Sequence, residues 1–541
     1  MSLASTHSAA APQRTLAKQV SPAAVKAMLT DGHELALVDV REELIFSQNH
    51  LLWARSVPLS RLELNFARLV PRPSTRIVLV DGGEGLAERA AAILGRNGYS
   101  DLAVLEGGIA AWTRAGFILF SGVNVPSKAF GEFIEHASAT PNVSAEELDQ
   151  LMRTHADIVV LDSRPFDEYA RVSIPTGINV PGAELVLRVR DLAPSPATTV
   201  VVNCAGRTRS IIGAQSLINA GLPNKVVALR NGTMGWTLAG LNCDHGETRR
   251  APAPSPAALS WAKSAAAEVA RRYGIPRIDA ATLARFRAEA DARTLYLFDV
   301  RDPADYAAGH LPGAISAPGG QLVQATDQYV GTLGARIVLC DDADVRAVMT
   351  ASWLKQMGHR DVFVLAAAGS ETGWPPAPVL ASTPPAELRI DSVELAALMA
   401  RDTATVVDLS LSRSYLKGHI PGAWFAIRAR LADALPKIAP AGTLVLTSED
   451  GALAAIAAPE AAALANIPVR YLAGGNAAWQ AAGQPLSTDA RMADDPVDVW
   501  LKPYERAGDT KGAMSEYLSW EVDLVARIER DGTCNFTTRR D

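Results

Sequence analysis

One cysteine stands in a setting that favours a reactive thiol. Cys204 follows the three valines 200–202 and Asn203, so a buried strand delivers its side chain to the start of a short loop. Arg207 and Arg209 come three and five residues later, and a helical apolar pattern begins at Ser210. Two cations and the N-terminal end of a helix both favour the ionised, nucleophilic form of a thiol. The sequence therefore predicts a catalytic nucleophile at Cys204.

The loop after Cys204 is suited to holding an anion. Its backbone amides are predicted to turn inward and form a nest around a negative charge. Gly206 allows this because it has no side chain to obstruct a close approach of the backbone. Besides the two arginines, the predicted substrate-binding residues are Ala205, Gly206, Thr208 and Ser210.

The surroundings of Cys204 belong to a pattern that occurs four times. Each repeat has an apolar strand ending in an acid, and each closes on a tryptophan. The acids are Asp39, Asp162, Asp299 and Asp408, and the tryptophans are Trp112, Trp236, Trp374 and Trp479. The spacings of 73, 74, 75 and 71 residues are too similar for coincidence. In three repeats an arginine stands two residues after the acid, at Arg41, Arg164 and Arg301.

Strands alternate with helical stretches within each repeat, which is typical of a parallel sheet covered by helices on both faces. We therefore predict an α/β fold of four tandem domains. Proline-rich breaks separate them. The predicted domains are residues 16–121, 122–250, 257–381 and 382–490, followed by a C-terminal tail over residues 491–541.

Composition limits the classes of partner and the cellular compartment that we expect for this chain. The net charge of −6 argues against a nucleic-acid partner, which usually requires a basic face. Four cysteines without paired spacing favour free thiols in a reducing compartment. Segment 1–14 lacks the apolar core of a signal peptide, and two prolines break the most apolar stretch, residues 452–469. We expect a cytoplasmic protein without a membrane partner; its oligomeric state stays open.

The repeats together resemble the rhodanese family of sulfurtransferases. The third repeat has Asp-x-Arg at residues 299–301 and Tyr-x-x-Gly-His-x-Pro-Gly-Ala at 306–314, and the fourth has the second motif at 415–423. The cysteine loop and the Gly-Gly-x-x-x-Trp turn complete the pattern, which covers roughly residues 16–490 as four tandem rhodanese-like domains.

This resemblance implies a double-displacement reaction. The thiolate of Cys204 would attack the outer sulfur of a small anionic donor such as thiosulfate and become a persulfide. The persulfide would then pass its sulfur to a thiol or to cyanide. Arg207 or Arg209 would bind the anionic end of the donor. The resemblance implies neither a metal nor an organic cofactor.

Activity is expected in the second repeat alone. Counting along the repeats assigns Val80, Cys340 and Thr447 to the position of Cys204. Valine has no nucleophilic atom, and threonine lacks a base. Three carboxylates follow Cys340 closely, which disfavours a thiolate and repels an anionic donor. We therefore predict that the first, third and fourth repeats are catalytically silent.

Loop length distinguishes sulfur transfer from phosphate chemistry. Cys204 and Arg209 enclose four residues, as in rhodaneses, whereas phosphatases of the related fold enclose five. Cys340 and Arg346 have the longer spacing, but the intervening acids would repel phosphate. Phosphatase activity is therefore the weaker interpretation.

Other features leave alternatives open. Asp162 and Arg164 are interpreted first as a structural salt bridge and second as residues that orient the loop. The second repeat has Val172 and Ser173 where the third and fourth have Gly-His, so no general base is assigned. A sulfur-carrier protein or a redox-sensing protein could use the same Cys204 thiol without being an efficient enzyme.

Overall fold

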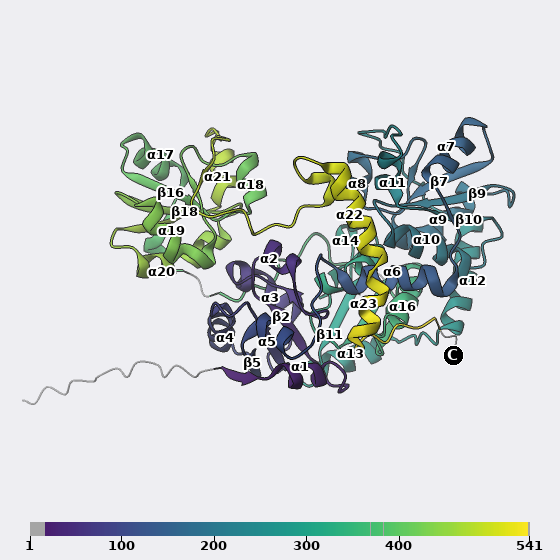
Figure 1. Ribbon diagram of the computed structural model, residues 1–541, viewed down its shortest axis with the longest axis horizontal. Coiled ribbons are helices and arrows are strands. Elements are labelled where there is room, and N and C mark those ends of the chain that lie inside the picture. The colour runs from purple at the N-terminus through teal and green to yellow at the C-terminus, as the bar shows by residue number, and fades with distance from the viewer. Residues whose placement is uncertain (1–16, 368, 382–383, 539–541) are drawn as a thin grey trace, which may run out of the picture.

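The computed structural model describes residues 17–367, 369–381 and 384–538, so segment 1–14 lies outside the described part. It contains a separate parallel sheet for each of the four repeats (Figure 1), which confirms the predicted fold class. Between their polar end residues the central strands are mainly apolar, because helices cover both faces of each sheet.

The first unit has the strand order β1 (Lys18–Val20), β5 (Leu102–Leu105), β4 (Ile77–Val80), β2 (Ala36–Asp39) and β3 (Arg55–Ser56). Its helices are α1 (Pro22–Met28), α2 (Glu43–Gln48), η1 (Leu59–Arg61), α3 (Leu62–Leu69), α4 (Leu86–Arg96) and α5 (Gly108–Arg114). A long helix, α6 (Val125–Ser138), then leads to the second unit.

The second unit repeats this topology with the order β6 (Asn142–Val143), β10 (Val226–Leu229), β9 (Thr199–Asn203), β7 (Ile158–Asp162) and β8 (Ile178–Asn179). Its helices are α7 (Ala145–Arg153), α8 (Phe166–Arg171), η2 (Gly182–Glu184), α9 (Leu185–Leu192), α10 (Thr208–Asn219) and α11 (Gly232–Leu238). Strand β9 lies in the middle of the sheet, and its three valines are fully buried. Helix α12 (Pro256–Arg272) leads to the third unit.

The third unit has the order β12 (Ile315–Ser316), β11 (Leu295–Asp299), β13 (Arg336–Asp341) and β14 (Val362–Ala366). Its helices are α13 (Ala280–Ala288), α14 (Pro303–Ala308), α15 (Gly319–Gln324), η3 (Thr326–Gln328) and α16 (Arg346–Gln356). It departs from the predicted repeat at its end. Trp374 is 62% exposed, whereas the tryptophans that close the other repeats are buried, so the third unit lacks the buried closing turn.

The fourth unit has the order β15 (Arg389–Ile390), β19 (Val469–Leu472), β18 (Thr443–Thr447), β16 (Ala404–Asp408), β17 (Trp424–Phe425) and β20 (Arg491–Met492). Its helices are η4 (Ala386–Leu388), α17 (Ser392–Ala400), α18 (Ser412–Lys417), η5 (Arg428–Arg430), α19 (Leu431–Ile438), α20 (Ala452–Leu464) and α21 (Gly475–Ala481). Strand β20 shows that the tail begins inside this sheet.

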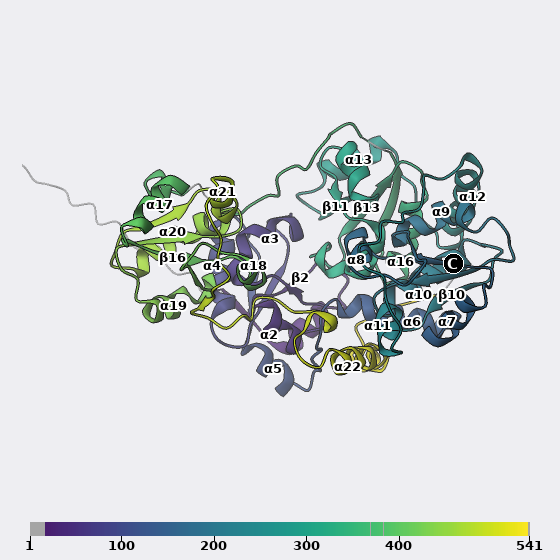
Figure 2. The ribbon, with the colours of Figure 1, turned by 90° about the horizontal axis from the view of Figure 1, so that it is seen from above.

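The units associate in two pairs. Helix η1 of the first unit packs against η5 of the fourth, and η2 of the second packs against α15 of the third. Figure 2 shows the first and fourth units side by side at one end of the molecule and the second and third at the other.

The tail crosses from the fourth unit back to the second. It forms η6 (Pro503–Glu505), α22 (Thr510–Val522) and α23 (Leu524–Asp531), and both long helices pack along α6 (Figure 1). The segment after the last repeat thus reaches the unit that contains Cys204. No helix among the described residues is long and apolar enough to cross a lipid bilayer.

Candidate active site

Cys204 lies where the sequence predicts it, between the end of β9 and the start of α10. Its neighbour Asn203 pairs with Asp162 of β7, so the cysteine is the first residue beyond the paired strand. The side chain is 2% exposed, and its Sγ lies 3.6 Å from the hydroxyl of Ser210 in the first turn of α10. The thiol is therefore enclosed at the N-terminal end of a helix.

The backbone of the loop has free hydrogen-bond donors on one side. Its carbonyls face α11: Cys204 O accepts from the amide of Thr233 at 2.9 Å, and Ala205 O accepts from that of Met234 at 3.0 Å. In contrast, within the described residues the six amides of residues 205–210 have no acceptor. Unpaired amides beside a thiol are what an anion nest requires, and the nest itself stays a prediction.

The guanidinium of Arg207 is ion-paired with carboxylates of α6. Its Nε and Nη2 donate to the two oxygens of Glu132 at 2.7 Å each, and Glu135 and Asn231 also accept from it. Burial opposes the charge of Arg207, but these hydrogen bonds and negative charges outweigh it and raise the pKa of the guanidinium. Arg207 thus joins the loop to α6 rather than projecting as a free cation.

Arg209 also has partners. It donates to Glu168 of α8 at 2.9 Å and to Gln321 of the third unit at 3.0 Å. Lys502 of the tail lies 3.3 Å from the same carboxylate. Burial disfavours the charge on Glu168, but Arg209 and Lys502 hold the pKa of this carboxyl below its ordinary value. The loop is therefore close to neutral overall, and the donor-binding role of both arginines stays a prediction.

Asp162 and Arg164 form a buried ion pair beside the loop. The guanidinium donates to the carboxylate at 2.8 Å and 2.6 Å, and Asn203 Nδ2 donates to the same carboxylate at 2.8 Å. Equivalent pairs hold the ends of β2 and β11, at Asp39 with Arg41 and at Asp299 with Arg301. The bond from Asn203 links the pair to the residue before Cys204, so a role in orienting the loop stays a prediction.

The strand registers correct the assignment of equivalent positions. Val80, Cys340 and Thr447 pair with the acids of their own repeats, as Asn203 does with Asp162. They are therefore the counterparts of Asn203, and the assignment from the sequence is wrong by one residue. The true counterparts of Cys204 are Asp81, Asp341 and Ser448.

Cys340 is accordingly a strand residue and not a loop residue. Its side chain is fully buried, with Sγ 3.4 Å from the carbonyl of Phe298 in the neighbouring strand. Burial, followed by the charges of Asp299 and Asp341, raises the pKa of the thiol. Arg346 points to Glu184 of the second unit, so the Cys340–Arg346 spacing does not form a phosphate-binding loop.

The histidines of the Gly-His motif have a structural role. His310 and His419 stack on the rings of Tyr306 and Tyr415 at 3.9 and 3.8 Å, and each Nδ1 lies within hydrogen-bond distance of that tyrosine's carbonyl. Ser173 takes their place in the second unit and makes the corresponding backbone bridge. The missing histidine therefore removes a packing residue, and these contacts give no evidence of a lost base.

The tail supplies neighbours of the loop that sequence reasoning missed. A Cβ atom added to Gly206 would lie 3.3 Å from Glu521 Oε2 and 3.8 Å from Leu518 Cδ2, both on α22. Leu518 and Met514 pack with Met234 of α11 in one apolar cluster. The tail is rich in aromatic residues, with Trp500, Tyr504, Tyr517 and Trp520, which favours packing, but no sequence pattern identified the loop as its target.

Three buried polar atoms around the loop have no hydrogen-bond partner within the described part of the chain. They are Asn203 Oδ1, Thr208 Oγ1 and Glu521 Oε2. Buried polar atoms are usually paired, because leaving one unpaired costs about 1–3 kcal/mol. Together with the free amides, they indicate a place built to receive a polar ligand.

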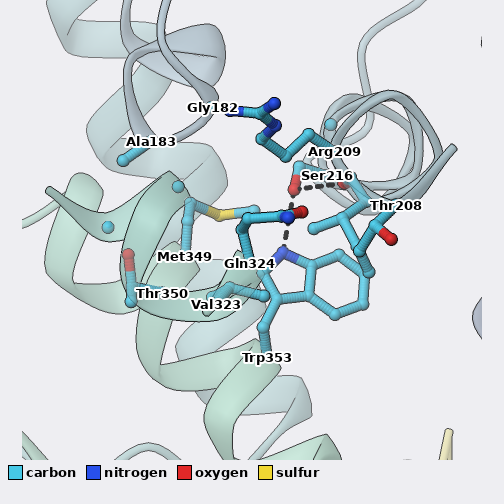
Figure 3. Close-up of a pocket in the computed structure, with 14 residues that line it drawn as sticks. Gly182, Ala183, Thr208, Arg209, Ser216, Val323, Gln324, Met349, Thr350 and Trp353 are labelled. Atoms are coloured by element: carbon cyan, nitrogen blue, oxygen red, sulfur yellow. Dashed lines mark hydrogen bonds between the residues drawn. The ribbon is translucent and has the colours of Figure 1, made fainter. Parts of the chain in front are cut away.

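A small cavity adjoins the loop on the side of the third unit. Thr208 and Arg209 line it, and Trp353 closes it by donating to Ser216 Oγ at 2.9 Å (Figure 3). Its volume of about 30 Å³ matches a single water molecule. A sulfur donor is larger, so it must approach Cys204 from elsewhere or displace a covering segment.

Comparisons with known proteins agree with the fourfold repeat. The rhodanese-like domain model matches residues 21–115, 144–239, 280–371 and 391–482. A crystal structure of a thiosulfate sulfurtransferase from Pseudomonas aeruginosa is 49% identical, with a TM-score of 0.94, over 97% of this chain and 100% of that one.

Two curated proteins share a single segment. MoeZ of Mycobacterium tuberculosis, named as an adenylyltransferase/sulfurtransferase, is 31% identical over 106 residues, which are 26% of its length. YrkF of Bacillus subtilis, named as a sulfur carrier, is 27% identical over 103 residues, or 54% of its length. The chain thus spans about a quarter to a half of these relatives. With four matched segments that cover more than half of its residues, the chain belongs to the rhodanese-like domain family.

Proposed function

We propose that this chain is a sulfurtransferase that carries a sulfane sulfur on Cys204. The observation that carries the proposal is a buried thiol at the start of a loop whose six backbone amides have no acceptor among the described residues. Such a nest stabilises the negative sulfur of a persulfide, as it does any small anion. Relatives named as sulfurtransferases support the same reaction class.

The reaction divides into two displacements. The Cys204 thiolate attacks the outer sulfur of thiosulfate, the sulfur–sulfur bond of the donor breaks, and sulfite leaves with the electron pair. An acceptor thiol or cyanide then attacks the outer sulfur of the persulfide, and Cys204 leaves as a thiolate. Because both arginines are ion-paired, we assign the stabilisation of the persulfide mainly to the amides of the loop.

Thiosulfate is the donor that the name of the Pseudomonas protein favours. The test is thiosulfate-dependent conversion of cyanide to thiocyanate by the wild type, Cys204→Ala and Cys340→Ala. We expect Cys204→Ala to lose all turnover and Cys340→Ala to keep it, because Cys340 is buried in a strand. Turnover that survives in Cys204→Ala would contradict the proposal.

A sulfur carrier is the second candidate, favoured by the similarity to YrkF. A carrier would take up one sulfur atom on Cys204 and release it slowly to small acceptors. Intact-mass measurement after loading, followed by addition of cyanide, separates the two functions. Prompt loss of the added sulfur favours the enzyme, and its retention favours the carrier.

A further inference from the structure

The tail places a carboxylate at the edge of the Cys204 loop. Glu521 of α22 is 1% exposed, and one of its oxygens, Oε1, is held by Lys128 Nζ at 2.8 Å and by the Tyr517 hydroxyl at 3.0 Å. The other oxygen, Oε2, has no partner within the described residues and faces the backbone of Gly206. Lys128 and Tyr517 thus fix the carboxylate with its free oxygen toward the loop.

The surroundings of Glu521 are apolar and exclude water, which strengthens the electrostatic effect of its carboxylate. Met234, Met514 and Leu518 are buried together beside Gly206. Charges in a site with little water interact more strongly than charges on the surface. A free carboxylate oxygen in such a place attracts a cation or a hydrogen-bond donor and repels an anion.

We propose that Glu521 selects the sulfur acceptor, and that the preferred acceptor is a small thiol that carries a positively charged amino group. This inference rests on the proposed sulfurtransferase function. The ammonium would pair with Glu521 Oε2 while the thiol reaches the persulfide of Cys204. An anionic acceptor would instead meet Oε2, the oxygen of this carboxylate that has no partner among the described residues.

The same carboxylate works against the loading half-reaction. Thiosulfate carries two negative charges, and Glu521 presents the negative end of its ion pair with Lys128, the oxygen Oε2, toward the loop. Removing the charge of Glu521 should therefore speed the loading of Cys204 by thiosulfate and slow its discharge to an aminothiol. Structural damage would slow both steps, so opposite changes are specific to charge selection.

The discharge step balances without any further reactant. The acceptor thiol releases its proton to solvent, and its sulfur forms a bond to the outer sulfur of the persulfide. The bond between the two persulfide sulfurs breaks, and its electron pair returns to Cys204 as a thiolate. The product is the persulfide of the acceptor.

The experiment compares two thiols of similar size and opposite charge, cysteamine and 3-mercaptopropionate. Cys204 is loaded with thiosulfate or with inorganic polysulfide, the excess is removed, and loss of the added sulfur is followed by intact mass. Each rate is divided by the rate of the same thiol with a small-molecule persulfide. We expect the wild type to favour cysteamine and Glu521→Gln to lower that preference about tenfold or more.

Glu516→Gln is the matched control, because Glu516 lies on the same helix and is exposed. It should keep the wild-type preference and loading rate. An unchanged preference in Glu521→Gln overturns the inference, and so do equal normalised rates for both thiols in the wild type, which requires no variant. A wild type that neither donor loads instead refutes the proposed function, and the inference with it.

Discussion

The residue at the position of Cys204 determines whether the loop amides are free or bound to a carboxylate of the protein itself. In the first unit, Asp81 accepts from the amides of Gly83 and Ala87 at 2.9 and 3.0 Å. In the third unit, Asp341 accepts from three amides of its own loop at 2.8, 3.2 and 2.9 Å. A carboxylate at this position supplies the anion that the nest requires. Cys204 leaves the corresponding amides free for a persulfide.

Cys204→Asp should place a carboxylate among the amides of the second unit's loop, as Asp81 and Asp341 do in theirs. We expect no sulfur transfer, because a carboxylate cannot form a persulfide. We also expect a higher melting temperature than for Cys204→Ser, since hydrogen bonds to a charged group are worth roughly 1.5–3 kcal/mol. Thermal unfolding of the two variants gives the comparison. A lower melting temperature for Cys204→Asp would show that the amides of this loop are not aimed at one anion.

Helix α11 supports the loop by donating hydrogen bonds to the carbonyls of Cys204 and Ala205. Asn203 and Thr233 tie the end of β9 to this helix, and the loop carbonyls accept from its first amides. Gly232 allows α11 to lie this close to the loop backbone, because it has no side chain. It has φ +53°, and a Cβ on it would lie 2.3 Å from Cys204 O and 2.8 Å from Gly206 O. The shape of the nest therefore depends on a glycine well outside the cysteine motif.

Gly232→Ala should displace α11 from the loop and reduce sulfur transfer strongly. Gly240→Ala is the matched control, because Gly240 has φ +76° and open space around its Cβ position. An alanine at either site has the cost of a left-handed backbone, about 1–2 kcal/mol. The clash with the loop is specific to Gly232. Melting temperatures and turnover of both variants separate the two effects, and equal turnover would count against this role.

The molecule as a whole is two pairs of repeats, joined by the tail and by contacts between the first and third units such as the bridge of Leu35 with Leu333. A buried bidentate ion pair, Glu63 with Arg428 at 2.6 and 2.7 Å, joins the first unit to the fourth. Glu184 pairs with Arg346 between the second and third units. The tail then brings the fourth unit's chain to α6 and to the Cys204 loop. The tail, which begins in the sheet of the fourth unit, thus reaches the loop of the second unit.

Much of this architecture could be predicted, because strand composition and repeated motifs are local properties. The thiol, its loop and the ion pair of Asp162 with Arg164 follow from residues close in sequence. Cys340 lies 41 residues after its acid whereas Cys204 lies 42 after its own, and strand pairing shows that this one residue leaves Cys340 inside the strand. The ion pair of Arg207 with Glu132 and the contact of Glu521 with the loop join distant segments, and no local pattern encodes such contacts.

The interface between the first unit, the fourth unit and the tail should make stability depend on pH. Glu42 is buried there, near Asp498, Arg430 and Arg61, and its carboxylate accepts from Ser60 at 3.1 Å. Burial, with the charge of Asp498 adding to it, raises the pKa of Glu42 from 4.5 to about 7. The folded protein therefore holds a proton that the unfolded chain releases above about pH 4.5.

This raised pKa sets the sign of the effect. The stabilising contribution of Glu42 is full at low pH and is lost as pH rises through about 7, a change of about 3 kcal/mol. Glu42→Gln keeps the neutral form at every pH, so it should raise the melting temperature relative to wild type at about pH 8 and change it little at about pH 4.5. The exposed Glu106→Gln serves as the control and should follow the wild type at both values. Parallel melting curves for Glu42→Gln and the wild type across this range would mean that Glu42 is ionised in the folded interface, with Arg430 and Arg61 outweighing its burial.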